Sequence, residues 1–82
     1  MEYIFDVRSL AEYQEKHMPG SINLPLDDIK KIESLVPDKD AKIYLYCENG
    51  KHSGCARTVL LYLGYTQVWN LGSMEEAEAT LS

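Results

Sequence analysis

Short apolar runs alternate with amphipathic stretches along the whole chain. Three runs rich in β-branched and aromatic residues are predicted to be strands: residues 3–7, 43–46 and 67–71. Residues 21–24 alternate between polar and apolar and are predicted to be a short fourth strand. The run at 43–46 is the most continuously apolar of the four. We therefore expect it to lie in the centre of a sheet, buried on both faces.

The segments between and after these runs predict four helices. Ser9 and Glu12 have the spacing of a capping box, so the first helix begins near Ser9 and continues to about residue 17, before Pro19 and Gly20. Apolar residues at intervals of three and four predict an amphipathic helix over 27–36 and another over 55–63. A last short helix is expected over 74–81.

Strands that alternate with helices through short connections are typical of an α/β fold. We expect a mainly parallel sheet of four to five strands flanked by helices. The 82 residues predict one domain, residues 1–82. Ligands of such sheets bind outside the carboxyl ends of the strands, and Cys47 follows the run 43–46 directly.

The charge balance narrows the classes of partner. Eight basic and thirteen acidic residues give a net charge of -5, which argues against nucleic acid and an anionic membrane surface. No run approaches the ~20 apolar residues of a membrane-spanning helix. The cysteines and histidines lack the paired short spacings of a zinc site, so we expect no metal.

Cys47 opens a short loop between a predicted strand and a predicted helix. A strand-to-helix loop directs backbone N–H groups inward, and the helix N-terminus adds partial positive charge. Lys51, His52 and Arg57 place a small cationic cluster beside it. Cysteine pKa falls in such surroundings, and the thiolate is the nucleophile, so Cys47 is the candidate for covalent catalysis.

Four motifs in order support a family resemblance. They are Asp6-Val7-Arg8, Tyr13-x-x-x-His17-Met18-Pro19-Gly20-Ser21-Ile22-Asn23-Leu24-Pro25, the loop Cys47–Ser53, and Leu63-Gly64-Tyr65-x-x-Val68-x-x-Leu71-Gly72. With these motifs, nearly the whole chain resembles the rhodanese homology domain, most closely the small single-domain sulfurtransferases of the phage-shock type. Ordered motifs are far more specific than one short match.

The resemblance implies a thiosulfate-type sulfurtransferase without a cofactor. Cys47 would take the sulfane sulfur of a small-molecule donor as a persulfide and pass it to a thiophilic acceptor, cyanide or a thiol. The substrate-binding loop would consist of Glu48, Asn49, Gly50, Lys51, His52 and Ser53. We expect a monomer. Because members of the phage-shock type are exported, periplasmic and cytoplasmic locations both stay open.

The loop also distinguishes between activities within the fold. The family's phosphatase-like relatives use a longer loop and an arginine clamp for phosphate, and position 53 is Ser. Phosphatase activity is therefore not expected. Glu48 and His52 depart from the thiosulfate-binding pattern. At Glu48, a negative charge beside the nucleophile opposes a dianionic donor.

Two other functions compete with the enzyme. The chain could be a non-catalytic rhodanese-like binding module, which Glu48 favours, or a redox protein with a disulfide between Cys47 and Cys55. Each further residue has a structural interpretation as well. Cys55 is predicted to pack in the core, His17 to satisfy local hydrogen bonds, Asp6 and Arg8 to form a pair, and Tyr44, Tyr46 and Trp69 to be core or rim aromatics.

Overall fold

The computed structural model describes residues 2–81 and contains a four-stranded, fully parallel sheet. The spatial order is β2-β1-β3-β4, which places β1 and β3 in the centre. The bounds are Glu2–Asp6 for β1, Ile22–Asn23 for β2, Lys42–Cys47 for β3 and Gln67–Ser73 for β4. The predicted α/β fold with a mainly parallel sheet is confirmed.

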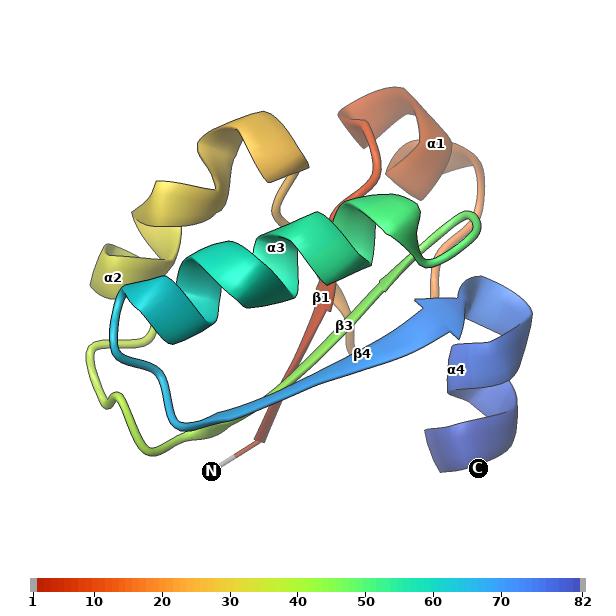
Figure 1. Cartoon of the computed structure of the whole chain (residues 1–82). Coiled ribbons are helices and arrows are strands. Elements are labelled where there is room, and N and C mark those ends of the chain that lie inside the picture. The colour runs from red at the N-terminus through yellow and green to blue at the C-terminus, as the bar shows by residue number, and fades with distance from the viewer. Residues whose placement is uncertain (1, 82) are drawn as a thin grey trace.

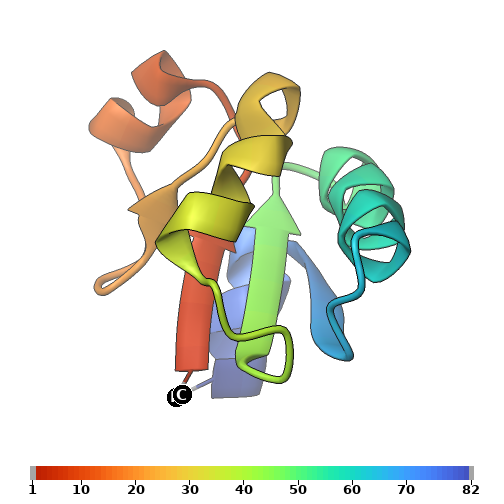
Figure 2. The same cartoon turned by 90° about the vertical axis from the view of Figure 1, so that its left-hand side faces the viewer.

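Helices lie on both faces of this sheet. They are α1 (Leu10–Glu15), the 3-10 helix η1 (Leu26–Lys31), α2 (Ile32–Leu35), α3 (Lys51–Tyr62) and α4 (Met74–Leu81). Figures 1 and 2 show η1, α2 and α3 on one face and α4 on the other, while α1 lies beyond the carboxyl end of β1. The carboxyl ends of the strands therefore face a rim made by α1 and the start of α3.

Alternation along the strands divides the apolar residues between the two faces. The larger core lies under η1, α2 and α3 and includes Phe5, Val7, Ile29, Ile32, Val36, Ile43, Leu45, Ala56, Leu60 and Val68. A smaller core under α4 contains Met18, Tyr46 and Ala77, with Ile4, Leu71 and Met74 packed against it. The strand β3 contributes to both cores, as expected of a central strand.

The segment predicted as one amphipathic helix over 27–36 starts as a 3-10 helix instead. Because a 3-10 helix has about three residues per turn, Ile29 and Ile32 fall on the same side and both are buried. Leu35, which the prediction placed on the apolar face, is 48% exposed. That part of the prediction is wrong, because a 3.6-residue period does not describe the first two turns.

Two helix boundaries also differ from the prediction. The capping box of Ser9 and Glu12 is present, but α1 ends at Glu15, because Lys16 is in extended backbone and its carbonyl oxygen accepts a hydrogen bond from Nη2 of Arg8. The second difference is at the start of α3, which begins at Lys51, four residues before the predicted start at Cys55. The loop after Cys47 is correspondingly short, and the N-terminus of α3 lies close to the end of β3.

Candidate active site

Cys47 is the last residue of β3 and lies beneath the start of α3, with only 1% of its surface exposed. Three residues, 48–50, turn the chain from the strand into the helix. Gly50 makes this turn with a φ of +86°, and a Cβ there would lie 3.2 Å from the Cα of Gly72. Both the backbone angle and the close approach require glycine at this position.

Three hydrogen bonds surround the Cys47 sulfur. The backbone N–H of Gly50 donates to Sγ at 3.0 Å and that of Ser53 at 3.4 Å, while the Ser53 hydroxyl lies 3.3 Å from Sγ. Burial pushes the pKa of the Cys47 thiol upward, but bonds from the Ser53 hydroxyl and from the amides of Ser53, Asn49 and Gly50 outweigh it. The net effect lowers the pKa of Cys47 below its ordinary value, which favours the nucleophilic thiolate.

A cavity of about 100 Å³ opens beside Cys47. Its other lining residues are Arg8, Glu12, Glu48, Asn49, Lys51 and His52. Two permanent cations therefore face two carboxylates around the nucleophile. Larger hollows of about 310 and 440 Å³ lie along β1 and beside η1, and their lining contains neither cysteine nor histidine.

The predicted loop residues separate into two groups in the structure. Glu48, Asn49, Lys51 and His52 line the cavity, whereas Gly50 and Ser53 contact the Cys47 sulfur without lining it. The side-chain oxygen of Asn49 also accepts from the backbone N–H of Lys51 at 3.0 Å, a local turn that leads into α3. One group therefore faces the space open to a ligand, and the other surrounds the sulfur atom.

Arg8 lines the cavity as well, and sequence reasoning treated it only as a structural partner of Asp6. The pair exists: Asp6 is fully buried and accepts from Nε and Nη2 of Arg8 at 2.7 to 3.1 Å. The described hydrogen bonds of Arg8 use Nε and Nη2, so its Nη1 group stays available. The parallel register, which pairs Asp6 with Tyr46, brings the end of β1 beside Cys47.

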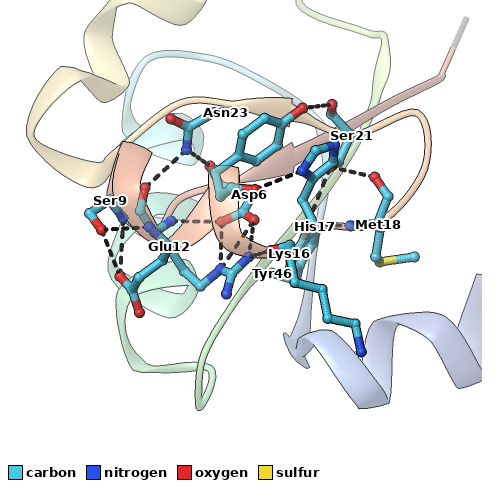
Figure 3. A network of polar contacts seen from close by, with 11 residues as sticks. Asp6, Ser9, Glu12, Lys16, His17, Met18, Ser21, Asn23 and Tyr46 are labelled. Atoms are coloured by element: carbon cyan, nitrogen blue, oxygen red, sulfur yellow. Dashed lines mark hydrogen bonds and ion pairs between the residues drawn. The ribbon is translucent and has the colours of Figure 1, made fainter.

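Figure 3 shows how polar contacts fix the segment that follows β1. The buried Tyr46 hydroxyl accepts from the backbone N–H of Met18 at 3.0 Å and lies 3.2 Å from the Ser21 hydroxyl. His17 contacts the carbonyl oxygen of Tyr13 through Nδ1 at 2.7 Å and stacks on its ring. The predicted local hydrogen bonding of His17 is confirmed, and this network secures the loop between α1 and β2.

Asn70 is a second residue that sequence reasoning missed. Its side chain accepts from the Ser53 hydroxyl at 2.6 Å and donates to the Gly50 carbonyl oxygen at 3.1 Å. The pairing of β3 with β4 shifts register after Leu45, and such irregularities re-aim side chains beside functional sites. Nothing in the local sequence of β4 indicates this contact, because it joins residues 17 and 20 positions apart.

The second cysteine does not pack in the core. Cys55 is exposed, and both thiols are free. The buried positions of α3 are Ser53, Ala56 and Leu60, at intervals of three and four, and Cys55 falls outside this stripe. The expected packing role is therefore wrong. The aromatic expectation is confirmed, with Tyr46 in the core and Tyr44 stacked on the partly exposed Trp69 at 5.2 Å.

Two kinds of feature are absent from residues 2–81. No group of three or more His, Cys, Asp or Glu side chains in this range is arranged to hold a metal ion. In the same range, none of the helices has the length and apolar character needed to cross a membrane.

Comparisons with known proteins agree on one family. The family model for the rhodanese-like domain matches residues 1–80. Thiosulfate sulfurtransferase PspE of Escherichia coli K12 is 41% identical over 76 residues, which cover 92% of this chain and 73% of that protein. A solved rhodanese with anions from E. coli superposes with a TM-score of 0.88 at 40% identity, covering 93% of this chain and 91% of the other. The human single-domain sulfurtransferase TSTD1 shares the fold, with a TM-score of 0.76 at 24% identity over 99% of this chain and 84% of its own.

Proposed function

Because the chain belongs to the rhodanese-like domain family, we propose that it is a sulfurtransferase that moves a sulfane sulfur from thiosulfate or a similar donor through a Cys47 persulfide. One observation carries the proposal most directly. The Cys47 sulfur is buried beside a small cavity, and hydrogen bonds from Gly50 and Ser53 hold its pKa below the ordinary value. This arrangement favours the thiolate, the form of cysteine that acts as a nucleophile.

The first half-reaction loads the enzyme. The Cys47 thiolate attacks the outer sulfur of thiosulfate and forms a new S–S bond. The sulfur–sulfur bond of the donor breaks, and sulfite leaves with the electron pair. The product is a Cys47 persulfide whose terminal sulfur bears the negative charge.

The second half-reaction unloads it. A thiophile attacks the terminal sulfur, the bond to Sγ breaks, and Sγ regains its electron pair as a thiolate. Cyanide would leave as thiocyanate and a thiol as a persulfide. Splitting the transfer into two covalent steps predicts ping-pong kinetics.

The loop amides and the nearby cations support these steps electrostatically. The N–H groups that face Sγ stabilise negative charge there without having to reorganise, as in an oxyanion hole. Arg8 and Lys51 line the cavity and can bind the anionic end of a donor. Glu12 and Glu48 oppose them, so we expect the site to bind a dianion such as thiosulfate weakly.

The size of the cavity supports a small donor. About 100 Å³ holds roughly three water molecules, at about 30 Å³ each in the liquid. A space of this size favours a small anion such as thiosulfate, whereas a larger substrate would have to present its reacting sulfur at the end of a narrow group. Donor and acceptor are therefore small molecules, or thiols that can enter without the bulk of their carrier.

The alternative of a non-catalytic binding module has one observation in its favour. Glu48 is exposed directly after the nucleophile and lowers the attraction for an anionic donor. A module with an incidental cysteine would not, however, need three hydrogen bonds on Sγ. An ordinary pKa at Cys47 in the folded protein would favour the module.

The deciding experiment is the intact mass of the reduced protein before and after brief incubation with thiosulfate. We expect a gain of one sulfur atom in the natural chain and in Cys55→Ser, and none in Cys47→Ser. Addition of cyanide should remove the added mass and release thiocyanate. No gain with thiosulfate or with any other sulfane donor contradicts the proposal.

A further inference from the structure

The side chain of Asn70 is held in one orientation by partners on three segments. Its Oδ1 accepts from the Ser53 hydroxyl at 2.6 Å and from the backbone N–H of Gly72 at 2.9 Å. Its Nδ2 donates to the carbonyl oxygen of Gly50 at 3.1 Å. Because Ser53 and Gly72 donate and Gly50 accepts, the oxygen and the nitrogen of the Asn70 amide can be assigned in only one way. Asn70 thus links β4 to the catalytic loop and to the first turn of α3.

The Ser53 hydroxyl lies between two acceptors and has one proton. Asn70 Oδ1 is 2.6 Å away and Cys47 Sγ is 3.3 Å away, and Ser53 is fully buried. When Cys47 is a thiol, its S–H donates to Ser53 Oγ while the Ser53 proton goes to Asn70. When Cys47 is a thiolate, Sγ has no proton to donate, and the Ser53 hydroxyl stabilises it only by turning its own proton away from Asn70.

We propose that Asn70 is a positioning residue for sulfur transfer, which holds the Ser53 proton while the Cys47 sulfur is uncharged and releases it when that sulfur is anionic. This inference rests on the proposed role of Cys47 as the sulfur carrier. No covalent bond of Ser53 breaks, because its hydroxyl only rotates. The proton lost by Cys47 leaves to water in the cavity, and Asn70 Oδ1 keeps its bond from Gly72 in both states.

The exchange matters because the charge on Sγ changes twice in each turnover. In the persulfide, Sγ is a neutral bridging atom and the charge lies on the terminal sulfur. A Ser53 proton with no second acceptor would then face a weak partner in a buried place, which costs free energy. With Asn70 beside it, that proton has a strong acceptor in the loaded enzyme. Asn70 therefore favours the persulfide relative to the free thiolate.

Other charged groups also surround Cys47 and affect its ionisation. Arg8 and Glu12 line the cavity from the β1 side, and Glu48, Lys51 and His52 line it from the loop and α3. On the β4 side, Glu76 of α4 accepts from the backbone N–H of Ser73, which pairs with Cys47 in the sheet. The test keeps all these groups unchanged, so that a difference between variants reports on Asn70 and Ser53.

The experiment measures the rate of alkylation of Cys47 by iodoacetamide against pH, in a Cys55→Ser background so that only one thiol reacts. The midpoint of this profile gives the pKa of Cys47. Asn70→Asp holds the Ser53 proton more strongly because its acceptor is charged, so the midpoint should rise by about one unit, a tenfold loss of thiolate near neutral pH. Asn70→Ser shortens the side chain and removes the Oδ1 acceptor, so the midpoint should stay at or below that of the parent.

A midpoint that rises in Asn70→Asp but not in Asn70→Ser indicates competition for the Ser53 proton. A loosened loop would instead raise the midpoint in both variants. A double-mutant cycle with Ser53→Ala removes the hydroxyl, and both effects of position 70 should then shrink to less than about a third. An equal effect of Asn70→Asp with and without the hydroxyl overturns the proposal, since direct repulsion by the new charge would explain it. A rise in the midpoint for Asn70→Ser also overturns it.

Gln67→Glu is the matched control. It makes the same change from amide to carboxylate on the same strand, and it likewise removes a donor to a backbone carbonyl, that of Asp40. Its midpoint should equal that of the parent. Circular dichroism checks each variant for folding, and the Asn70→Ser comparison carries the test if Asn70→Asp does not fold. Persulfide formation in the parent tests the function separately, because alkylation needs no sulfur donor.

Discussion

β1 and β3 lie side by side and end at the same edge of the sheet, yet the buried side chains at their ends, Asp6 and Cys47, have different surroundings. At the end of β1, the Asp6 carboxylate is enclosed by Arg8, with hydrogen bonds to both of its oxygens. At the end of β3, Cys47 has only neutral donors around Sγ and a cavity on its open side. The first end is closed by a countercharge and anchors the fold, and the second stays open to a reactant.

The difference shows what separates an anchor from a nucleophile in the same type of strand end. A full positive charge would neutralise the sulfur and block access to it. Backbone N–H groups and one hydroxyl stabilise negative charge without occupying the space that a substrate needs. Arg8, which pairs with Asp6 at the end of β1, also lines the cavity beside Cys47, so the ion pair helps to form the site.

The largest expected effect comes from opening the closed end. Asp6→Ala leaves Arg8, whose side chain is 10% exposed, without its partner. Removal of one member of a buried pair costs about 3 to 5 kcal/mol, and we expect a loss near the lower figure in the free energy of unfolding, measured with urea. The control Glu15→Ala removes an exposed carboxylate and should change the free energy of unfolding by less than about 0.5 kcal/mol. Equal losses in the two variants would refute the distinction.

The next effect comes from distorting the open end. Gly50→Ala places a Cβ at a φ of +86° and 3.2 Å from Gly72, so it should cost about 2 kcal/mol and slow the alkylation of Cys47. Gly20→Ala is the control, because Gly20 has a φ of +82° but no atom within 4 Å of the added Cβ. It should show the backbone strain alone and leave Cys47 unaffected. Alkylation unchanged in Gly50→Ala would contradict the assigned role of the loop.

A smaller effect is expected from the charge beside the nucleophile. Glu48→Gln removes an exposed negative charge from the cavity wall, and the KM for thiosulfate should fall by about threefold, since such a charge contributes under about 1 kcal/mol in water. The ratio should shrink at high salt because exposed charges are screened. Glu75→Gln on α4 makes the same change away from the cavity and should leave KM unaltered. Steady-state kinetics at two ionic strengths measures both.

The smallest effect is the contribution of the Cys47 thiolate to stability. Its pKa in the folded protein lies below the ordinary value of 9.0, so this contribution is fully present above pH 9 and is lost as the pH falls through the folded pKa. The difference in free energy of unfolding between the Cys55→Ser protein and Cys47→Ser/Cys55→Ser should therefore grow as the pH rises from neutral toward 9. Urea unfolding at several pH values measures it. A difference independent of pH would contradict the lowered pKa.

Local patterns in the sequence were sufficient for the strands and for the place of Cys47. The central strands β1 and β3 contain compact apolar runs, and the capping box at Ser9 and Glu12 needs only four residues to be recognised. The α3 boundary was missed because it depends on the positive φ of Gly50, which lets the helix begin at Lys51. Helical periodicity does not detect an N-terminus made of polar and small residues.

The parts of the site that sequence reasoning missed depend on pairing between distant segments. Arg8 reaches the cavity because β1 lies beside β3. Asn70 reaches Ser53 because β4 pairs with β3 and shifts register near its end. Both residues have ordinary local surroundings in the sequence, so their roles follow only once the order and register of the strands are known.

The bond between Asn70 and Ser53 also bears on when the site is completed during folding. The contacts around Cys47 join β1, β3 and β4, and β4 is the last of these strands to be synthesised. Pairing of parallel strands is non-local and slow compared with helix formation. The site around Cys47 is therefore complete only after β4 has joined the sheet.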